Sequence, residues 1–331
     1  MLSEAAERTQ GWVCPFCLSD LEANQRSLTC TVCRKDYPVT ASGQPDFRPK
    51  TPCEFTLRYS YDPAWARFSW ERVRVGWPEK ALEFPTTEDW ESTEYSMMQS
   101  IPKAPDGGRS LDLGCGIARQ RFKEPLSLLG YHHTGIDIDG NAPDALADAH
   151  LLPFSDESFD LVVTSAAFEH VKNPHVAMTE AARVTKQGAL FVGSIAFNEP
   201  FHISYFHQSP LAVYELLVSS GFDCCSIILS NTWNVFSAHL EMGFAGIHYP
   251  RMLRELIVGT LYRGSLLPAK VKSLLRRNSS ILRTAELSFA RSHTASVGFV
   301  AVRTVCAHEN RMLRGFRQID SSRVSTEVGL T

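Results

Sequence analysis

The chain has 331 residues, of which 44% are apolar and 21% are charged, and its formal net charge is −3. This composition suits a globular protein of one or two domains and excludes a strong basic field for nucleic-acid binding. No apolar run reaches the 18 residues of a membrane span, and the first ten residues lack the apolar core of a signal peptide. Five of the nine cysteines remain once two close pairs are set aside. This odd number indicates reduced thiols and a cytoplasmic protein.

Residues 11–50 contain the two close cysteine pairs. Cys14 and Cys17 form one C-x-x-C, Cys30 and Cys33 form another, and twelve residues separate them. Four thiolates presented on two tight turns make a tetrahedral Zn²⁺ site, and the metal supplies folding free energy that so short a segment lacks. We therefore predict a structural zinc module. Two unrelated pairs, or a redox-active pair, are the alternative.

Residues 51–109 are rich in aromatic residues and prolines. Asp62-Pro63 is a typical helix start, which predicts a short helix over 64–75. We interpret the whole segment as a linker and helical lid. Its rings could cover the reacting group of a ligand, or they could cover a sheet edge and dock the zinc module.

The turn that follows Ser110 predicts a nucleoside-binding site. Asp112 precedes Gly114 and Gly116, and the two glycines let a ligand lie against the backbone. Asp137 ends a second strand 21 residues after Gly116, where a carboxylate can accept hydrogen bonds from ribose hydroxyls. The dinucleotide pattern is incomplete, because Gly116 is followed by Ile-Ala-Arg, and an acid beside the glycines favours a cationic ligand.

The motif D-L-G-C-G at 112–116 resembles the first motif of class I S-adenosylmethionine-dependent methyltransferases. Further motifs follow in the family's order at 148–154, 158–163 and 168–171. The resemblance implies an α/β fold with a Rossmann-like seven-stranded sheet over 110–305, in which Asp148 receives the adenine amino group. The residues implied in cofactor binding are Asp112, Gly114, Gly116, Asp137, Ile138, Asp148, Ala149 and Ser165.

The zinc module has a resemblance of its own. Tyr37-Pro38-Val39 and the run from Gly43 to Phe47 resemble the end of the zinc ribbons related to the tRNA-methyltransferase activator subunit. A similar ribbon also precedes the catalytic domain in a bacterial rRNA guanine methyltransferase. This resemblance implies a small zinc ribbon, held by the four cysteines, ahead of the catalytic domain.

The remaining elements of the sheet follow from hydrophobic pattern and helix caps. Pro125 predicts that the first helix is kinked or begins late, near Glu124. Asp148 follows Ile138 by only ten positions, which is too few for a helix between two strands. Strands are predicted at 159–165, 189–196 and 222–229, helices at 174–184 and 210–220, and a final antiparallel strand at the sheet edge over 297–305.

The loop at 198–208 follows the fifth strand and should face the transferred methyl group. Its histidines, His202 and His207, are candidate general bases for a hydroxyl or ammonium acceptor. Each could instead be a loop histidine bonded to backbone. We expect His170 to be structural or to line the cofactor cleft.

The sequence predicts a helical insertion over residues 231–294 and a polar C-terminal tail over residues 306–331. The segment from 251 to 291 contains nine Lys and Arg residues and two Glu residues, which gives it a local net charge of +7. This segment could contact a membrane surface or RNA phosphates, or be a solvated helical cap.

The sequence therefore predicts a cytoplasmic enzyme that uses S-adenosylmethionine and carries Zn²⁺. Its expected acceptor is a small molecule, a lipid or a natural product. One alternative is an RNA-base methyltransferase whose ribbon contacts RNA, although an N/D-P-P-(Y/F) signature for amino methylation is lacking. Another is a non-catalytic scaffold that keeps the fold.

Overall fold

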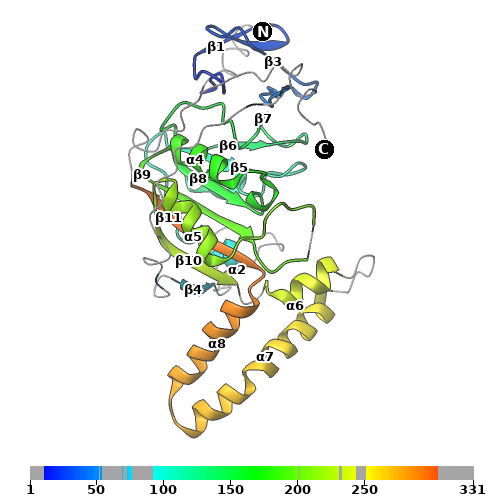
Figure 1. The fold of residues 1–331 in the computed structure, drawn as a ribbon, viewed down its shortest axis with the longest axis vertical. Helices are drawn as coiled ribbons and strands as arrows, with labels where there is room; N and C mark the ends of the chain where they lie inside the picture. Colours follow the sequence, from blue (N-terminus) through cyan, green and yellow to red (C-terminus); the bar gives the residue numbers. More distant parts are fainter. Residues whose placement is uncertain are drawn as a thin grey trace, which may run out of the picture.

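The computed structural model describes residues 11–51, 53, 69, 73–76, 92–200, 202–230, 233–243 and 251–304. Its centre is one eight-stranded sheet (Figure 1). In spatial order the strands are β4 (Val73–Gly76), β10 (Phe222–Ser230), β11 (Ser296–Arg303), β9 (Thr185–Ala196), β8 (Phe159–Ser165), β5 (Arg109–Leu113), β6 (His132–Asp137) and β7 (Ala145–Leu146). The pairs from β9 to β7 are parallel.

Seven of these strands confirm the predicted Rossmann-like methyltransferase sheet. The final strand is antiparallel as expected, but its predicted place at the edge is wrong, because β11 lies between β9 and β10. β10 is joined to β11 through the insertion, so β11 returns beside it and fills the space next to β9.

The eighth strand, β4, runs parallel to β10 at the outer edge. It corrects the predicted helix over 64–75, because residues 73–76 are extended and two valines in Val-Arg-Val-Gly favour a strand. Apart from Ser69, the rest of that predicted helix lies outside the described residues, as does most of the predicted lid.

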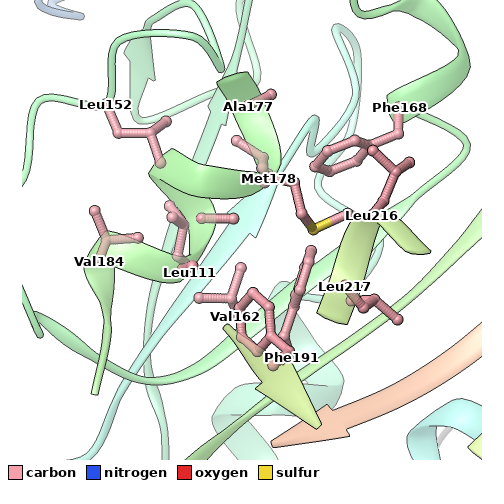
Figure 2. Close-up of a cluster of buried hydrophobic side chains, with 14 of the residues drawn as sticks. Leu111, Leu152, Val162, Phe168, Ala177, Met178, Val184, Phe191, Leu216 and Leu217 are labelled. Atoms are coloured by element: carbon pink, nitrogen blue, oxygen red, sulfur yellow. The ribbon is translucent and has the colours of Figure 1, made fainter. Parts of the chain in front are cut away.

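Helices cover both faces of the sheet. α4 (Pro174–Val184) and α5 (Pro210–Ser219) pack on one face, where Val162 of β8 and Phe191 of β9 are buried (Figure 2). α2 (Ser92–Met98) and α3 (Lys123–Leu128) belong to the core of the other face, with Leu161 and Val163 of β8. Successive residues of β8 thus point to opposite cores, as expected for a central parallel strand.

Helix ends follow the local sequence signals. Asn173 and Ser209 cap α4 and α5 by accepting hydrogen bonds from backbone amides two or three residues into each helix, and a proline follows each cap. α3 begins at Lys123, which confirms the late start. Residues 138–144 form turns instead of a helix, which confirms the lost second helix.

The N-terminal module is a three-stranded antiparallel sheet of β1 (Leu21–Ala23), β2 (Ser27–Cys30) and β3 (Asp36–Pro38). The chain after it continues the large sheet beyond β7. Phe47 donates its amide hydrogen to the Leu146 carbonyl at 2.8 Å, and the Leu146 amide donates to the Pro45 carbonyl at 2.9 Å. Trp12 stacks on Phe154 with ring centroids 4.8 Å apart. The module therefore covers the region where the second helix is missing.

The insertion between β10 and β11 projects away from the sheet as a helical hairpin (Figure 1). It contains α6 (Val235–Ala238), η4 (His239–Gly243), α7 (Arg251–Leu275) and α8 (Ser279–His293). Among the described residues, no helix combines the length and hydrophobicity that crossing a bilayer requires. The predicted tail at 306–331 lies outside the described residues.

The central strand β5 contains a buried carboxyl group. Asp112 is 0% exposed, and neither of its carboxylate oxygens has a hydrogen-bond partner among the described residues. Burial raises the pKa of Asp112 well above its ordinary value, and the negative charge of Asp137 raises it further. The folded protein therefore favours the neutral acid at this position.

We expect Asp112→Asn to raise the free energy of unfolding by about 1 to 4 kcal/mol at pH 7. The unfolded chain ionises this carboxyl above its ordinary pKa of about 4, whereas the folded chain resists ionisation, so the wild type loses stability as the pH rises. The gain should shrink towards zero at pH 4. Urea unfolding at both pH values measures it, with the exposed Asp106→Asn as control. The same gain at both pH values would contradict the explanation.

Candidate functional site

A cavity of about 1000 Å³ opens at the carboxyl ends of β5, β6 and β8. All but one of the predicted cofactor-binding residues line it, which places them in one site. These residues are Gly114, Gly116, Asp137, Ile138, Asp148, Ala149 and Ser165. Asp112 is the exception, because it is fully buried in β5 and is not among the lining residues.

Both glycines of the first turn are required by its geometry. Gly114 has φ +79°, and a Cβ there would collide with the Ala167 Cβ. Gly116 has φ +96°, and a Cβ there would lie 2.8 Å from the Arg119 carbonyl oxygen. An L side chain would be strained and would collide at either position. The turn thus keeps bare backbone against the cavity, which fits a ligand that lies close to it.

Asp137 connects the two strand ends. Its carboxylate accepts hydrogen bonds from the Gly116 amide at 2.9 Å and from the Ile138 amide at 2.7 Å. These bonds fix the carboxylate at the cavity wall, where its remaining lone pairs can accept hydroxyl hydrogens.

The surroundings of Asp148 favour the ionised carboxylate, which can accept hydrogen bonds. Burial raises its pKa, but hydrogen bonds from the His150 ring and amide outweigh burial, so the pKa of Asp148 lies below its ordinary value. The other ring nitrogen of His150 accepts the Asn173 amide at 3.0 Å. His150 therefore ties Asp148 to the start of α4.

A half-buried ion pair between α2 and the segment before α3 supports the same wall. The Ser165 hydroxyl, at the end of β8, donates to Glu94 Oε1 at 2.6 Å, and Glu94 pairs with Arg121 at 2.8 Å. Glu94 is 2% exposed. Sequence reasoning missed this residue, because no motif surrounds it and its partners are far away in the chain.

The segment after the N-terminal module also lines the cavity, and two of its lining residues belong to the predicted linker and lid at 51–109. Pro49, Thr51 and Cys53 are lining residues, and Arg48 donates to the Ile138 carbonyl at 3.0 Å. No local motif signals this placement, because it follows from the pairing of residues 45–47 with β7.

The structure places the two candidate bases beside the cavity, not in its lining. His202 and His207 have ring centroids 5.4 Å apart, and His207 Nε2 lies 2.8 Å from the Ser204 hydroxyl oxygen. Burial lowers the pKa of His207, which favours the neutral ring that a general base needs. His170 lines the cavity, in agreement with one of the two roles expected for it.

Two carboxyl groups accompany these histidines, of which Glu169 is fully buried and Glu199 partly buried. Burial raises the pKa of Glu169 to about 7; the backbone amides of Glu169 and Ala196 partly offset this rise, but neither reaches hydrogen-bonding geometry with the carboxylate oxygens. Burial also raises the pKa of Glu199, whose carboxylate accepts the Trp233 indole hydrogen at 2.8 Å. The sequence motif contained Glu169, but its burial depends on the tertiary fold.

The four N-terminal cysteines come together as predicted. Their sulfur atoms lie within 4.8 Å of one another, with Cys14 and Cys33 separated by 3.5 Å and Cys17 and Cys30 by 3.4 Å. Thiolates bound tetrahedrally to zinc, about 2.3 Å from the ion, lie about 3.8 Å apart. The cluster fits such an ion closely, and the Tyr37 hydroxyl lies 3.0 Å from the Cys14 sulfur as a further polar contact.

Comparison with known proteins agrees with this geometry. Residues 111–193 match the family model for a methyltransferase domain. A ubiquinone biosynthesis O-methyltransferase of Maricaulis maris is 32% identical over 103 residues, which are 26% of this chain and 40% of that protein. An uncharacterized chloroplastic methyltransferase of Arabidopsis thaliana is 25% identical over 267 residues, or 66% of this chain and 73% of that protein.

Among solved structures, one similar fold occurs in a complex of the Haloferax volcanii Trm112 methyltransferase activator with a methyltransferase. It is 18% identical, covers 64% of this chain and 89% of that chain, and has a TM-score of 0.39. The chain spans less than half the length of the first curated relative. The fold is the Rossmann-like fold of methyltransferases, and the segment from β5 to β9 carries the sequence pattern of that domain.

Proposed function

We propose that the chain transfers the methyl group of S-adenosylmethionine to a small-molecule acceptor. The observation that carries this proposal is the single cavity that the Gly114–Gly116 turn, Asp137 and Asp148 share. The match of residues 111–193 to a methyltransferase domain supports the choice of cofactor. The similarity to a ubiquinone biosynthesis O-methyltransferase supports a small acceptor that carries a hydroxyl group.

In this proposal the predicted cofactor-binding residues contact different parts of the cofactor. Asp137 accepts hydrogen bonds from the ribose hydroxyls, while Asp148 and the Ala149 backbone receive the adenine. The bare backbone at Gly114 and Gly116, with Ser165 and the Glu94 pair behind it, surrounds the methionine part of the cofactor. Asp112 lies buried in β5 behind the turn and does not line the cavity, so it has no direct contact with the cofactor in this proposal.

Methyl transfer needs little more than alignment. The acceptor atom attacks the methyl carbon, and the bond to sulfur breaks with its electron pair staying on sulfur. The protein mainly orients the two partners. A hydroxyl acceptor must also lose a proton, and we assign this role to His207, because its lowered pKa favours the neutral ring.

Removing the Asp137 side chain tests cofactor binding directly. We expect Asp137→Ala to weaken binding of S-adenosylmethionine by about 10- to 100-fold, because charge-assisted hydrogen bonds to hydroxyl groups are lost. Isothermal titration measures the change, and thermal unfolding checks that the variant is folded. Asp139→Ala is the matched control, since this exposed carboxylate lies two residues further along the same strand end.

Binding without turnover would favour the scaffold alternative, and no binding by the wild type would contradict the proposed function. The acceptor can be sought by mass spectrometry of a cell extract incubated with the protein and deuterium-labelled methyl donor. A labelled nucleoside in the digested RNA of that extract would favour the RNA-base alternative.

We further propose that Cys14, Cys17, Cys30 and Cys33 bind one structural Zn²⁺. A mercurial reagent that modifies thiols should release one equivalent of zinc per chain, and Cys17→Ser should abolish this release. Cys225→Ser, which changes an exposed cysteine on β10, should leave it unchanged. Release of the metal should also lower the melting temperature, because Trp12 and Phe47 pack against the methyltransferase domain. A protein that releases no zinc would rule the site out.

We also propose that the tip of the helical hairpin contacts a membrane surface. Leu274 and Leu275 at the end of α7 are 71% and 80% exposed, and Arg276 and Arg277 follow them. Exposed leucines beside cations suit the surface of an anionic bilayer.

We expect Leu274→Glu combined with Leu275→Glu to weaken binding to vesicles of phosphatidylcholine and phosphatidylglycerol by at least about tenfold, since burying each leucine contributes about 1.5–3 kcal/mol. Leu128→Glu, which changes an exposed leucine on α3, is the control. Cosedimentation measures the binding. Equal binding to pure phosphatidylcholine, or by both variants, would contradict this role.

A further inference from the structure

A second group of metal-ligating side chains lies beside the cavity. Glu169 and His170 belong to the short helix η3 (Phe168–His170) after β8, and His202 lies in the loop after β9. One ligand atom from each lies within 4.8 Å of the other two. Glu169 is 0% exposed, and its carboxylate oxygens have no hydrogen-bond partner among the described residues. A buried carboxylate without partners is costly unless a ligand completes its surroundings.

The two imidazole rings are oriented as metal ligands usually are. His170 Nδ1 lies 3.0 Å from the Ile203 carbonyl oxygen, and His202 Nδ1 lies 2.9 Å from the Pro200 carbonyl oxygen. A carbonyl can only accept, so each Nδ1 carries a hydrogen, and in the neutral ring each Nε2 keeps its lone pair. Metal-binding histidines are commonly fixed in this way by a backbone carbonyl.

The loop that supplies His202 is tied to η3. The Tyr205 and Phe206 amides donate to the Glu169 carbonyl at 2.7 and 3.2 Å. Ile203, whose carbonyl orients His170, has φ +64°, an unfavourable region for a β-branched residue. The fold thus holds three potential ligands from two distant segments in one place.

We propose that Glu169, His170 and His202 bind a divalent transition-metal ion. Glu199 is a fourth donor within reach, because its Oε2 lies 3.8 Å from His202 Nε2. Two imidazoles with one or two carboxylates form a nitrogen and oxygen site of the kind that binds Zn²⁺, Mn²⁺ or Fe²⁺. Ligands about 2.1 Å from one ion lie about 3 to 3.5 Å apart, so binding needs only small side-chain movements.

The site lies at the wall of the proposed cofactor cavity, since His170, Phe168 and Tyr205 line that cavity. This part of the inference rests on the proposed function. A cation there would coordinate the acceptor oxygen and lower the pKa of its hydroxyl, which then loses its proton to water or to His207. The oxygen forms its bond to the methyl carbon as the carbon–sulfur bond breaks, and the electron pair stays on sulfur.

Cobalt titration tests the site without any activity measurement. Co²⁺ is added to protein whose cysteine cluster is filled with zinc, and the visible absorption is recorded. We expect one equivalent to bind with the weak bands of nitrogen and oxygen ligands and without thiolate charge-transfer bands. Glu169→Gln and His202→Ala should each weaken binding by more than about tenfold. His207→Ala, a neighbouring histidine outside the cluster, should bind like the wild type.

Absence of binding, thiolate bands alone, or wild-type affinity in both Glu169→Gln and His202→Ala would overturn the site. Thermal unfolding identifies any variant that fails to fold. His202 is on a loop and partly exposed, so its variant keeps the test informative if Glu169→Gln is unstable. Titration with S-adenosylmethionine is measured separately. Loss of cofactor binding with intact cobalt binding refutes the proposed function alone, and the reverse result refutes the metal site alone.

Discussion

The hydrogen bond from the Gly116 amide to the Asp137 carboxylate joins the two strand ends that carry the centre of the cavity wall. It requires β5 and β6 to be parallel and in register, with Leu113 beside Ile136, so that both strands end at the same edge. It also requires a turn with positive φ, which glycine provides. A shift of one residue in either strand would move the carboxylate to the other face of the sheet and separate it from the turn.

The N-terminal module occupies the place next to β7 that the missing second helix leaves uncovered. A short connection between β6 and β7 leaves the edge and face of β7 without their usual cover. The chain at 45–47 pairs with β7, and Phe47 joins the main core, so the module supplies that cover. The same placement brings Pro49, Thr51 and Cys53 to the cavity wall. A segment placed for packing thereby becomes part of the ligand site.

Local sequence signals correctly predicted the turns and helix ends that they control. The positions of segments that pair or pack over long distances in the chain could not be predicted from them. The glycines, the two helix caps and the short β6–β7 connection act within a few residues, and the structure confirms the tight turn, the two helix starts and the missing helix. β4 could not be predicted, because its only strand partner among the described residues is β10, about 150 residues later. Glu94 was missed for the same reason, since Ser165 and Arg121 reach it only through the tertiary fold.

The two roles available to His202 are mutually exclusive. Its Nδ1 hydrogen is engaged by the Pro200 carbonyl, so Nε2 has the one available lone pair. That lone pair can accept a proton from the acceptor or bind a metal ion, but it cannot do both. If Glu169, His170 and His202 hold a cation, proton acceptance falls to water or to His207, which lies outside the cluster. The unpartnered Glu169 carboxylate, facing two rings whose hydrogens point away, favours the metal.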